Sequence, residues 1–178
     1  RLERLSSQLD RFSRSNPDGT LFALVHLSAT EVQMYSATHA MLVSVMCGLA
    51  AREVLSWSPE MEERVRKVAL TMNVAMTDLQ DRLALQLDPP SEVQQSAIDA
   101  HAAKSSEILT AMGVADPTWL EAVRDHHTHT PGPLRGRSEG QQLARLVQRA
   151  DMFAARLSPR ASRVPVAPGA AMQACYFD

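Results

Sequence analysis

Apolar side chains recur along most of this chain with the spacing of an α-helix. Over residues 1–14 they lie three or four positions apart, which predicts an amphipathic helix. "NPDG" at 16–19 is typical of a turn. "TLFALVHL" at 20–27 has no clear period, and a short helix is slightly favoured there over a strand. The residues that define the first helix are Leu2, Leu5, Leu9 and Phe12.

Capping patterns predict where the longer helices begin. The stretch "SATE" at 28–31 has the form of a capping box and predicts a helix that ends near Leu55. Ser58 followed by Pro59 predicts a second helix start. That helix is expected to reach about Leu87 with a break, before two prolines end it. The remaining helices are predicted at 91–112, 116–127 and 139–157, with a last short one from Pro168.

These elements together predict an all-α fold. No alternating strand pattern competes with the helical spacing, and no repeat divides the 178 residues. We therefore expect a bundle of about seven helices. Residues 1–30 are interpreted as an N-terminal helical segment. Residues 31–178 are interpreted as the main helical domain, which is expected to continue beyond 178.

Composition excludes some classes of partner. The formal net charge is −2 and the isoelectric point is about 6.3, so no basic surface predicts nucleic-acid or anionic-membrane binding. We expect no membrane span, because no apolar run reaches the required length of roughly 18–20 residues. The two cysteines, Cys47 and Cys175, form no close motif. A cytoplasmic protein without disulfides is therefore expected.

Histidines supply the candidate chemistry. The stretch "RDHHTHTPGP" holds three of the six histidines, at the predicted end of a helix. Single ligands from several helices can converge on one metal ion, and imidazoles with a carboxylate suit iron, manganese or zinc. A solvated helix end explains paired histidines about as well, and His129 is expected to be exposed in the loop. The candidate metal ligands are His39, His101, His126, His127 and Asp151.

The order of these segments resembles the HD-GYP family of phosphohydrolases, which cleave cyclic di-GMP. The similar stretches are "YSATHAMLVSVMCGLA", "VRKVALTMNVAM", "IDAHAAKSSEIL", "AVRDHHTHTPGPLRG" and "LARLVQRADMFAARLSPRASR". They cover about three-quarters of the chain in a consistent order. The resemblance implies that the helical bundle is HD-domain-like and that it has a site for two metal ions. It also implies that the five candidate ligands correspond to ligand positions of the family.

The departures from that family fall on its most important residues. Met72 and Asn73 stand where the family has its His-Asp dyad, whose Asp bridges two metal ions. Ala75 and Met76 replace the family's Gly-Lys, so the expected cation for the phosphate is missing. Methionine is a poor ligand for a hard divalent ion, and asparagine carries no charge to offset two cations. Met72 and Asn73 are therefore interpreted as vestigial dyad positions, without any catalytic residue.

The expected function is a catalytically inactive regulatory or protein-interaction module in bacterial cyclic-dinucleotide signalling. Its partner would be another protein or other domains of the same longer chain. One alternative is a metal-dependent phosphodiesterase with an altered ligand set. Another is a cyclic-dinucleotide binder without hydrolysis, whose phosphates would contact arginines. We expect no firmly bound cofactor, and at most one weakly bound iron, manganese or zinc ion. The candidate phosphate contacts are Arg135, Arg137, Arg160 and Arg163.

Overall fold

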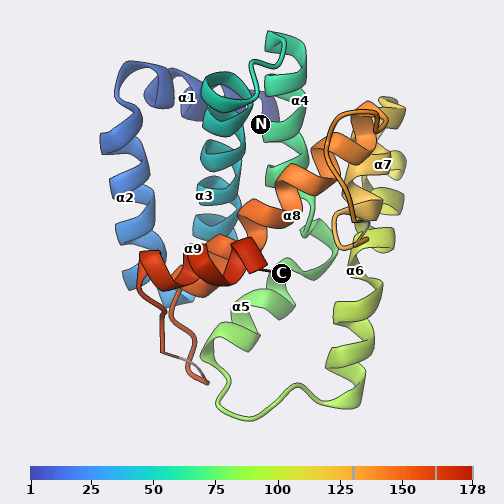
Figure 1. The fold of residues 1–178 in the computed structure, drawn as a ribbon. Coiled ribbons are helices and arrows are strands. Elements are labelled where there is room, and N and C mark those ends of the chain that lie inside the picture. Colours follow the sequence, from blue (N-terminus) through green and yellow to red (C-terminus); the bar gives the residue numbers. More distant parts are fainter. Residues whose placement is uncertain (130, 163, 178) are drawn as a thin grey trace.

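The computed structural model describes residues 1–129, 131–162 and 164–177, and within these ranges the chain is an all-α bundle without a strand (Figure 1). This confirms the predicted fold class. Two 3₁₀ turns and one π-helical turn join or extend the α-helices. The α-helices are α1 (Leu2–Ser15), α2 (Pro17–Thr30), α3 (Tyr35–Leu49), α4 (Pro59–Thr71), α5 (Thr77–Leu85), α6 (Glu92–Ala111), α7 (Pro117–Asp125), α8 (Glu139–Leu157) and α9 (Pro168–Phe177).

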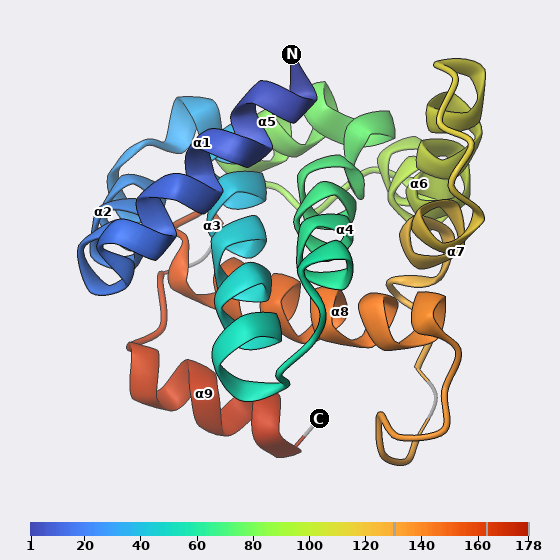
Figure 2. The ribbon, with the colours of Figure 1, turned by 90° about the horizontal axis from the view of Figure 1, so that it is seen from above.

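Helix α3 lies in the middle of the bundle and is buried over most of its circumference. It contacts α1, α2, α4, α5 and α8, and Figure 2 shows it among these helices. Leu42, Val43 and Cys47 are completely buried in it. Cys47 is thus a small core residue, and burial raises the pKa of its thiol. A helix that is apolar on all sides is expected at the centre of a bundle.

The stretch Val32–Val54, which includes α3, has the length and hydropathy of a helix that could cross a membrane. This corrects the expectation that no run is long enough. Scattered polar residues, such as Ser36 and Thr38, interrupt the apolar run. The high mean hydropathy of the stretch is therefore missed when only unbroken apolar runs are considered. Within the bundle, 61% of its most apolar window is buried. Such burial is typical of the central helix of a globular domain.

The chain begins α2 and α3 differently from the prediction. "NPDG" is not a turn, because Asn16 caps α2 by accepting a hydrogen bond from the Gly19 amide at 2.9 Å, with Pro17 as the first helical residue. The segment 20–27 is helical, as favoured. Ser28 opens no helix and lies buried inside α2. The first turn of α3 is instead capped from α5, where the carboxylate of Asp81 accepts from the backbone and hydroxyl of Ser36 at 2.7 and 3.0 Å.

A buried group of charges attaches α1 to α3 and α4. The carboxylate of Glu62, which is 2% exposed, accepts hydrogen bonds from three guanidinium groups. These belong to Arg14 of α1, to Arg52 after α3 and to Arg66 one turn further along α4. Arg66 also reaches Asp10 of α1 at 3.1 Å. Because a buried carboxylate is stable only when paired, this contact fixes the N-terminal helices on the rest of the bundle. Leu9 and Leu24 belong to the same hydrophobic core.

The predicted break after Ser58 lies between α4 and α5, where a 3₁₀ turn, η3 (Val74–Met76), joins the two helices. An extended segment at 86–91 then leads to α6, which begins at the predicted place with a capping box of Ser91 and Gln94. All buried residues of α6 lie from His101 onward. The first half of α6 therefore has no fully buried residue, and it projects from the bundle at the lower right of Figure 1.

Helix α7 is held in a defined position on α4. Asp116 caps α7 by accepting from the backbone amides of Thr118 and Trp119, and it pairs with Arg64 of α4 at 2.7 Å. The indole of Trp119 donates to the hydroxyl of Thr71 at 3.0 Å. Helix α8 then crosses α3, α4 and α7, so that the C-terminal half of the chain closes one side of the bundle (Figure 2).

We predict that Asp116→Ala lowers the free energy of unfolding by about 1–2 kcal/mol, because it removes an N-cap and the ion pair with Arg64. Chemical denaturation of both proteins measures the difference. The matched control is Asp88→Ala, at an exposed loop position, which should leave stability unchanged within about 0.5 kcal/mol. Equal effects of the two substitutions would show that α7 does not depend on this cap.

The contribution of Asp116 should also depend on pH. Burial alone would raise the pKa of this carboxyl group, but hydrogen bonds from Arg64 and the α7 backbone lower it below the ordinary value. A group with a lowered pKa in the folded state stabilises the fold fully above its unfolded pKa of roughly 3.9. That stabilisation is lost as pH falls through the lower folded pKa, so the difference from Asp116→Ala should decrease in acid.

Candidate metal centre

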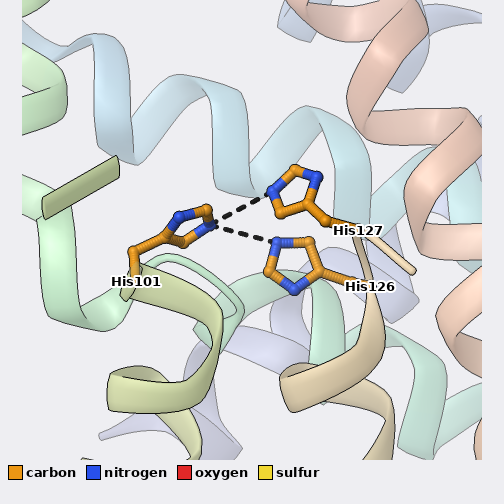
Figure 3. Close-up of side chains that lie close together, drawn as sticks. All are labelled: His101, His126 and His127. Atoms are coloured by element: carbon orange, nitrogen blue, oxygen red, sulfur yellow. Dashed lines mark hydrogen bonds between the residues drawn. The ribbon is translucent and has the colours of Figure 1, made fainter. Parts of the chain in front are cut away.

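Three of the predicted ligands meet at one point of the bundle. His101 comes from the middle of α6, and His126 and His127 follow the last residue of α7. Their rings converge, as Figure 3 shows, with the Nε2 atom of His101 3.3 Å from Nε2 of His126 and 3.2 Å from Nε2 of His127. Within the described ranges, these three are the group of potential ligands whose donor atoms all lie within 4.8 Å of one another.

Backbone carbonyl groups fix the orientation of two of these rings. Nδ1 of His101 contacts the carbonyl oxygen of Ile98, and Nδ1 of His126 lies 2.6 Å from the carbonyl oxygen of Val123. A carbonyl oxygen only accepts, so each Nδ1 carries a proton and donates it. In the neutral form each Nε2 then has a free lone pair. Metal-binding histidines commonly have this second hydrogen bond.

Burial opposes a proton at the centre of the cluster. His126 is completely buried, and burial together with the neighbouring His127 lowers its pKa to about 4. The pKa of His127 is also lowered, mainly by burial. The ring of His126 is therefore neutral at pH 7. Facing lone pairs repel each other unless a proton or a cation lies between them, and the low pKa values favour the cation.

The distances between the nitrogens fit such a cation. Two Zn–N bonds of about 2.0–2.1 Å at the tetrahedral angle hold their nitrogens roughly 3.3–3.4 Å apart. The two Nε2 separations from His101, 3.2 and 3.3 Å, are close to this value. Three neutral imidazoles without a carboxylate suit zinc or iron better than manganese, which prefers oxygen. His101, His126 and His127 could therefore hold one such ion.

The other two predicted ligands are bound to each other. Nε2 of His39 in α3 donates to the carboxylate of Asp151 in α8 at 2.6 Å. Burial alone would raise the pKa of Asp151, but the bond to His39 and the nearby imidazoles lower it to about 2. The carboxylate is thus ionised and paired. His39 also stacks on Tyr35 with 5.4 Å between ring centroids. The structure therefore places this pair outside the three-histidine cluster.

A pocket of about 160 Å³ adjoins both groups. It is lined by His101 and His127 from the cluster and by His39 and Asp151 from the pair. Met72 and Asn73, interpreted from the sequence as vestigial dyad positions, differ in their surroundings. Asn73 lines this pocket, whereas Met72 is completely buried in the hydrophobic core and does not belong to the lining. The other lining residues are Met76, Gln80, Leu83, Ile98, Ala155 and Arg160.

The arginines predicted to contact phosphates lie in different places. Arg160 lines the pocket, and its guanidinium donates to the hydroxyl of Tyr35 at 2.7 Å. Arg135 is exposed in the loop before α8. Arg137 donates to backbone carbonyls of that same loop. Arg163 lies outside the described residues. Of the three arginines that lie within the described residues, the structure brings Arg160 to the pocket.

Sequence reasoning did not find Gln80. Its side chain is part of the lining, and the residue is buried to 8% exposure. The local sequence gives little signal, because this amide stands between Leu79 and Asp81 in a stretch of α5 that is rich in charged residues. His129 is exposed, as expected for a loop residue.

Comparisons with known proteins add no further constraint on the site. The chain matches no protein-family model, no curated protein and no solved structure. Its geometry is therefore interpreted on its own chemistry.

We predict that zinc at about 100 times its dissociation constant raises the free energy of unfolding by about 2.7 kcal/mol, because a ligand that binds only the folded chain stabilises it by mass action. His126→Gln should weaken zinc binding by at least roughly 100-fold. Loss of a group that only hydrogen-bonds to a metal ligand already lowers metal affinity 10–100-fold, and this substitution removes the ligand itself. Competition with a coloured chelator measures both affinities.

The matched control for this prediction is His129→Gln, which changes an exposed histidine two residues from the cluster. It should leave zinc affinity unchanged. Equal zinc affinity in the wild type and in a folded His126→Gln protein would contradict the assignment of the cluster as a metal centre.

Proposed function

We propose that this chain is a non-hydrolytic regulatory module that holds one divalent metal ion in its three-histidine cluster. The resemblance to the HD-GYP family supplies the wider context, which is bacterial cyclic-dinucleotide signalling through a protein partner or another domain. The metal part of the proposal rests on the Nε2 atom of His101, which lies 3.3 Å from Nε2 of His126 and 3.2 Å from Nε2 of His127, with all three donor atoms within 4.8 Å of one another. This arrangement favours one bound ion over the expectation of no firmly bound cofactor.

The chemistry of the pocket opposes phosphodiester hydrolysis. An ion with an open position can polarise a phosphate or activate water. In the family that the sequence resembles, however, a carboxylate bridges a pair of ions, and here Asn73 stands at that position. Asp151, the carboxylate in the lining, is already bonded to His39. The lining therefore offers no unpaired carboxylate to hold a second ion or to act as a base.

The position of the missing lysine is also informative. Met76 occupies it in the sequence, and its side chain lines the pocket. A thioether presents an apolar surface where a cation would stabilise the charge of a transferring phosphoryl group. The loss of two such interactions typically costs 10²–10³-fold each in turnover. A phosphodiesterase with an altered ligand set is therefore the weaker alternative.

We predict no hydrolysis of cyclic di-GMP above a metal-only blank, with zinc, iron or manganese supplied to anaerobically prepared protein. The reason is the absence of a carboxylate bridge at Asn73 and of a cation at Met76. Product formation is measured by chromatography, together with the metal content of each sample. Turnover that His127→Ala abolishes would show a working hydrolytic site and reject the proposal.

A second prediction concerns Asn73. Asn73→Asp puts a negative charge in the lining beside His101 and His127 without a change of shape, and should tighten divalent metal binding by roughly 10-fold. Metal titration of the variant and the wild type measures the change. Asn16→Asp provides the matched control, because Asn16 caps α2 far from the pocket and aspartate caps equally well. Equal effects of the two substitutions would place Asn73 outside the metal environment.

A further inference from the structure

The pocket beside the three histidines is small. Its volume of about 160 Å³ is close to the roughly 150 Å³ of a cavity that holds one benzene ring. Pockets that enclose larger organic ligands measure about 300–1,000 Å³. A cyclic dinucleotide, with two nucleotides in one ring, is several times too large to be enclosed. The size of the pocket indicates a ligand of only a few heavy atoms.

The charges that line the pocket favour an anion once the metal ion is bound. Asp151 and Arg160 offset each other, while Asn73 and Gln80 are neutral amides. A divalent ion held by neutral imidazoles adds two positive charges that nothing else in the lining balances. Arg160 has further donor capacity, because only Nε and Nη2 bond to Tyr35. Its Nη1 makes no hydrogen bond among the described residues.

The apolar part of the lining distinguishes between small anions. Met76, Leu83 and Ile98 contribute side chains that offer no hydrogen bond. Phosphate carries oxygen on every side, so some of its oxygens would lose water without a new partner. A short carboxylate carries its charge at one end and leaves an alkyl group to contact these side chains. The mixed lining therefore fits the carboxylate better.

We propose that the metal-loaded pocket binds a short-chain carboxylate, whose charged group is held near Arg160 and whose alkyl group lies against Met76, Leu83 and Ile98. This inference rests on the proposed function, because the bound ion supplies the excess positive charge. It assigns the regulatory ligand of the site to small organic acids and not to cyclic dinucleotides.

The test is calorimetric titration of the zinc-loaded 178-residue chain with acetate, propionate and butyrate, and with inorganic phosphate as the competing anion. Each added methylene should tighten binding by about fourfold, as burial of a CH₂ group does. The gain should stop when the alkyl chain outgrows the pocket. Phosphate should bind more weakly than butyrate, and the chelator-treated protein should bind none of the carboxylates measurably.

Two variants locate the binding site. Arg160→Gln should weaken all carboxylates by about 10-fold, as expected for loss of a charge-assisted hydrogen bond, whereas Arg135→Gln at the exposed loop should have no effect. Ala155→Leu fills part of the pocket and should remove the gain with chain length. Neither change in the pocket should alter zinc content, since Arg160 and Ala155 are not ligands.

The possible failures are distinguishable because zinc content is measured in every sample. A fully zinc-loaded chain that binds no carboxylate, or prefers phosphate, overturns this inference and leaves the proposed metal site intact. Carboxylate binding that is equally strong without zinc overturns the charge argument. A chain that takes up no zinc overturns the proposed function, and this inference with it.

Discussion

The burial of α3 at the centre of the bundle is the constraint on which the other contacts depend. Five helices pack around it, so its buried polar side chains must find partners either within the local chain, as Thr38 does, or on a neighbouring helix. Ser36 finds Asp81 of α5, and His39 finds Asp151 of α8. These bonds are specific as well as stabilising, because a buried polar group left unpaired costs roughly 1–3 kcal/mol. They fix how α5 and α8 approach the central helix.

The candidate metal centre arises from the same packing. Helix α7 is fixed on α4 through Arg64 and Trp119, and this contact brings the end of α7 to the middle of α6. The hydroxyl of Ser105, one turn after His101, also accepts from the backbone amide of Ala75 at 3.1 Å. The turn that carries Asn73 and the helix that carries His101 are therefore tied together. The pocket is bounded by elements with defined relative positions, which is what small-ligand selectivity requires.

Local sequence predicted the parts of the fold whose causes are local. The starts of α4 and α6 followed from Ser58 and from Ser91 with Gln94, because an N-cap needs only residues close in sequence. The start of α3 could not be predicted in this way, since its capping carboxylate, Asp81, is 45 residues away. Ser28 misled for the same reason: an apparent capping pattern does not act when tertiary packing continues the preceding helix through it.

The site shows the same division between local and distant causes. Residue types and their order indicated a group of histidines and one aspartate, but not how they would pair. The structure separates them into a three-histidine cluster and a His39–Asp151 pair. That separation depends on side-chain distances between α3, α6, α7 and α8. The same holds for the difference between Met72, in the core, and Asn73, in the pocket, which are neighbours in the chain.

The projecting first half of α6 has a consequence for the motions of this domain. None of residues 92–100 is fully buried, although several are half-buried, and His101 is the first fully buried residue of the helix. Amide hydrogens before His101 are thus protected from exchange with solvent mainly by the helix itself, and those after it by the whole fold. His101 therefore lies at the boundary between the part of α6 that opens locally and the part that opens only with the whole fold. A ligand bound to the three-histidine cluster would therefore contact α6 at the residue where local opening of the helix ends.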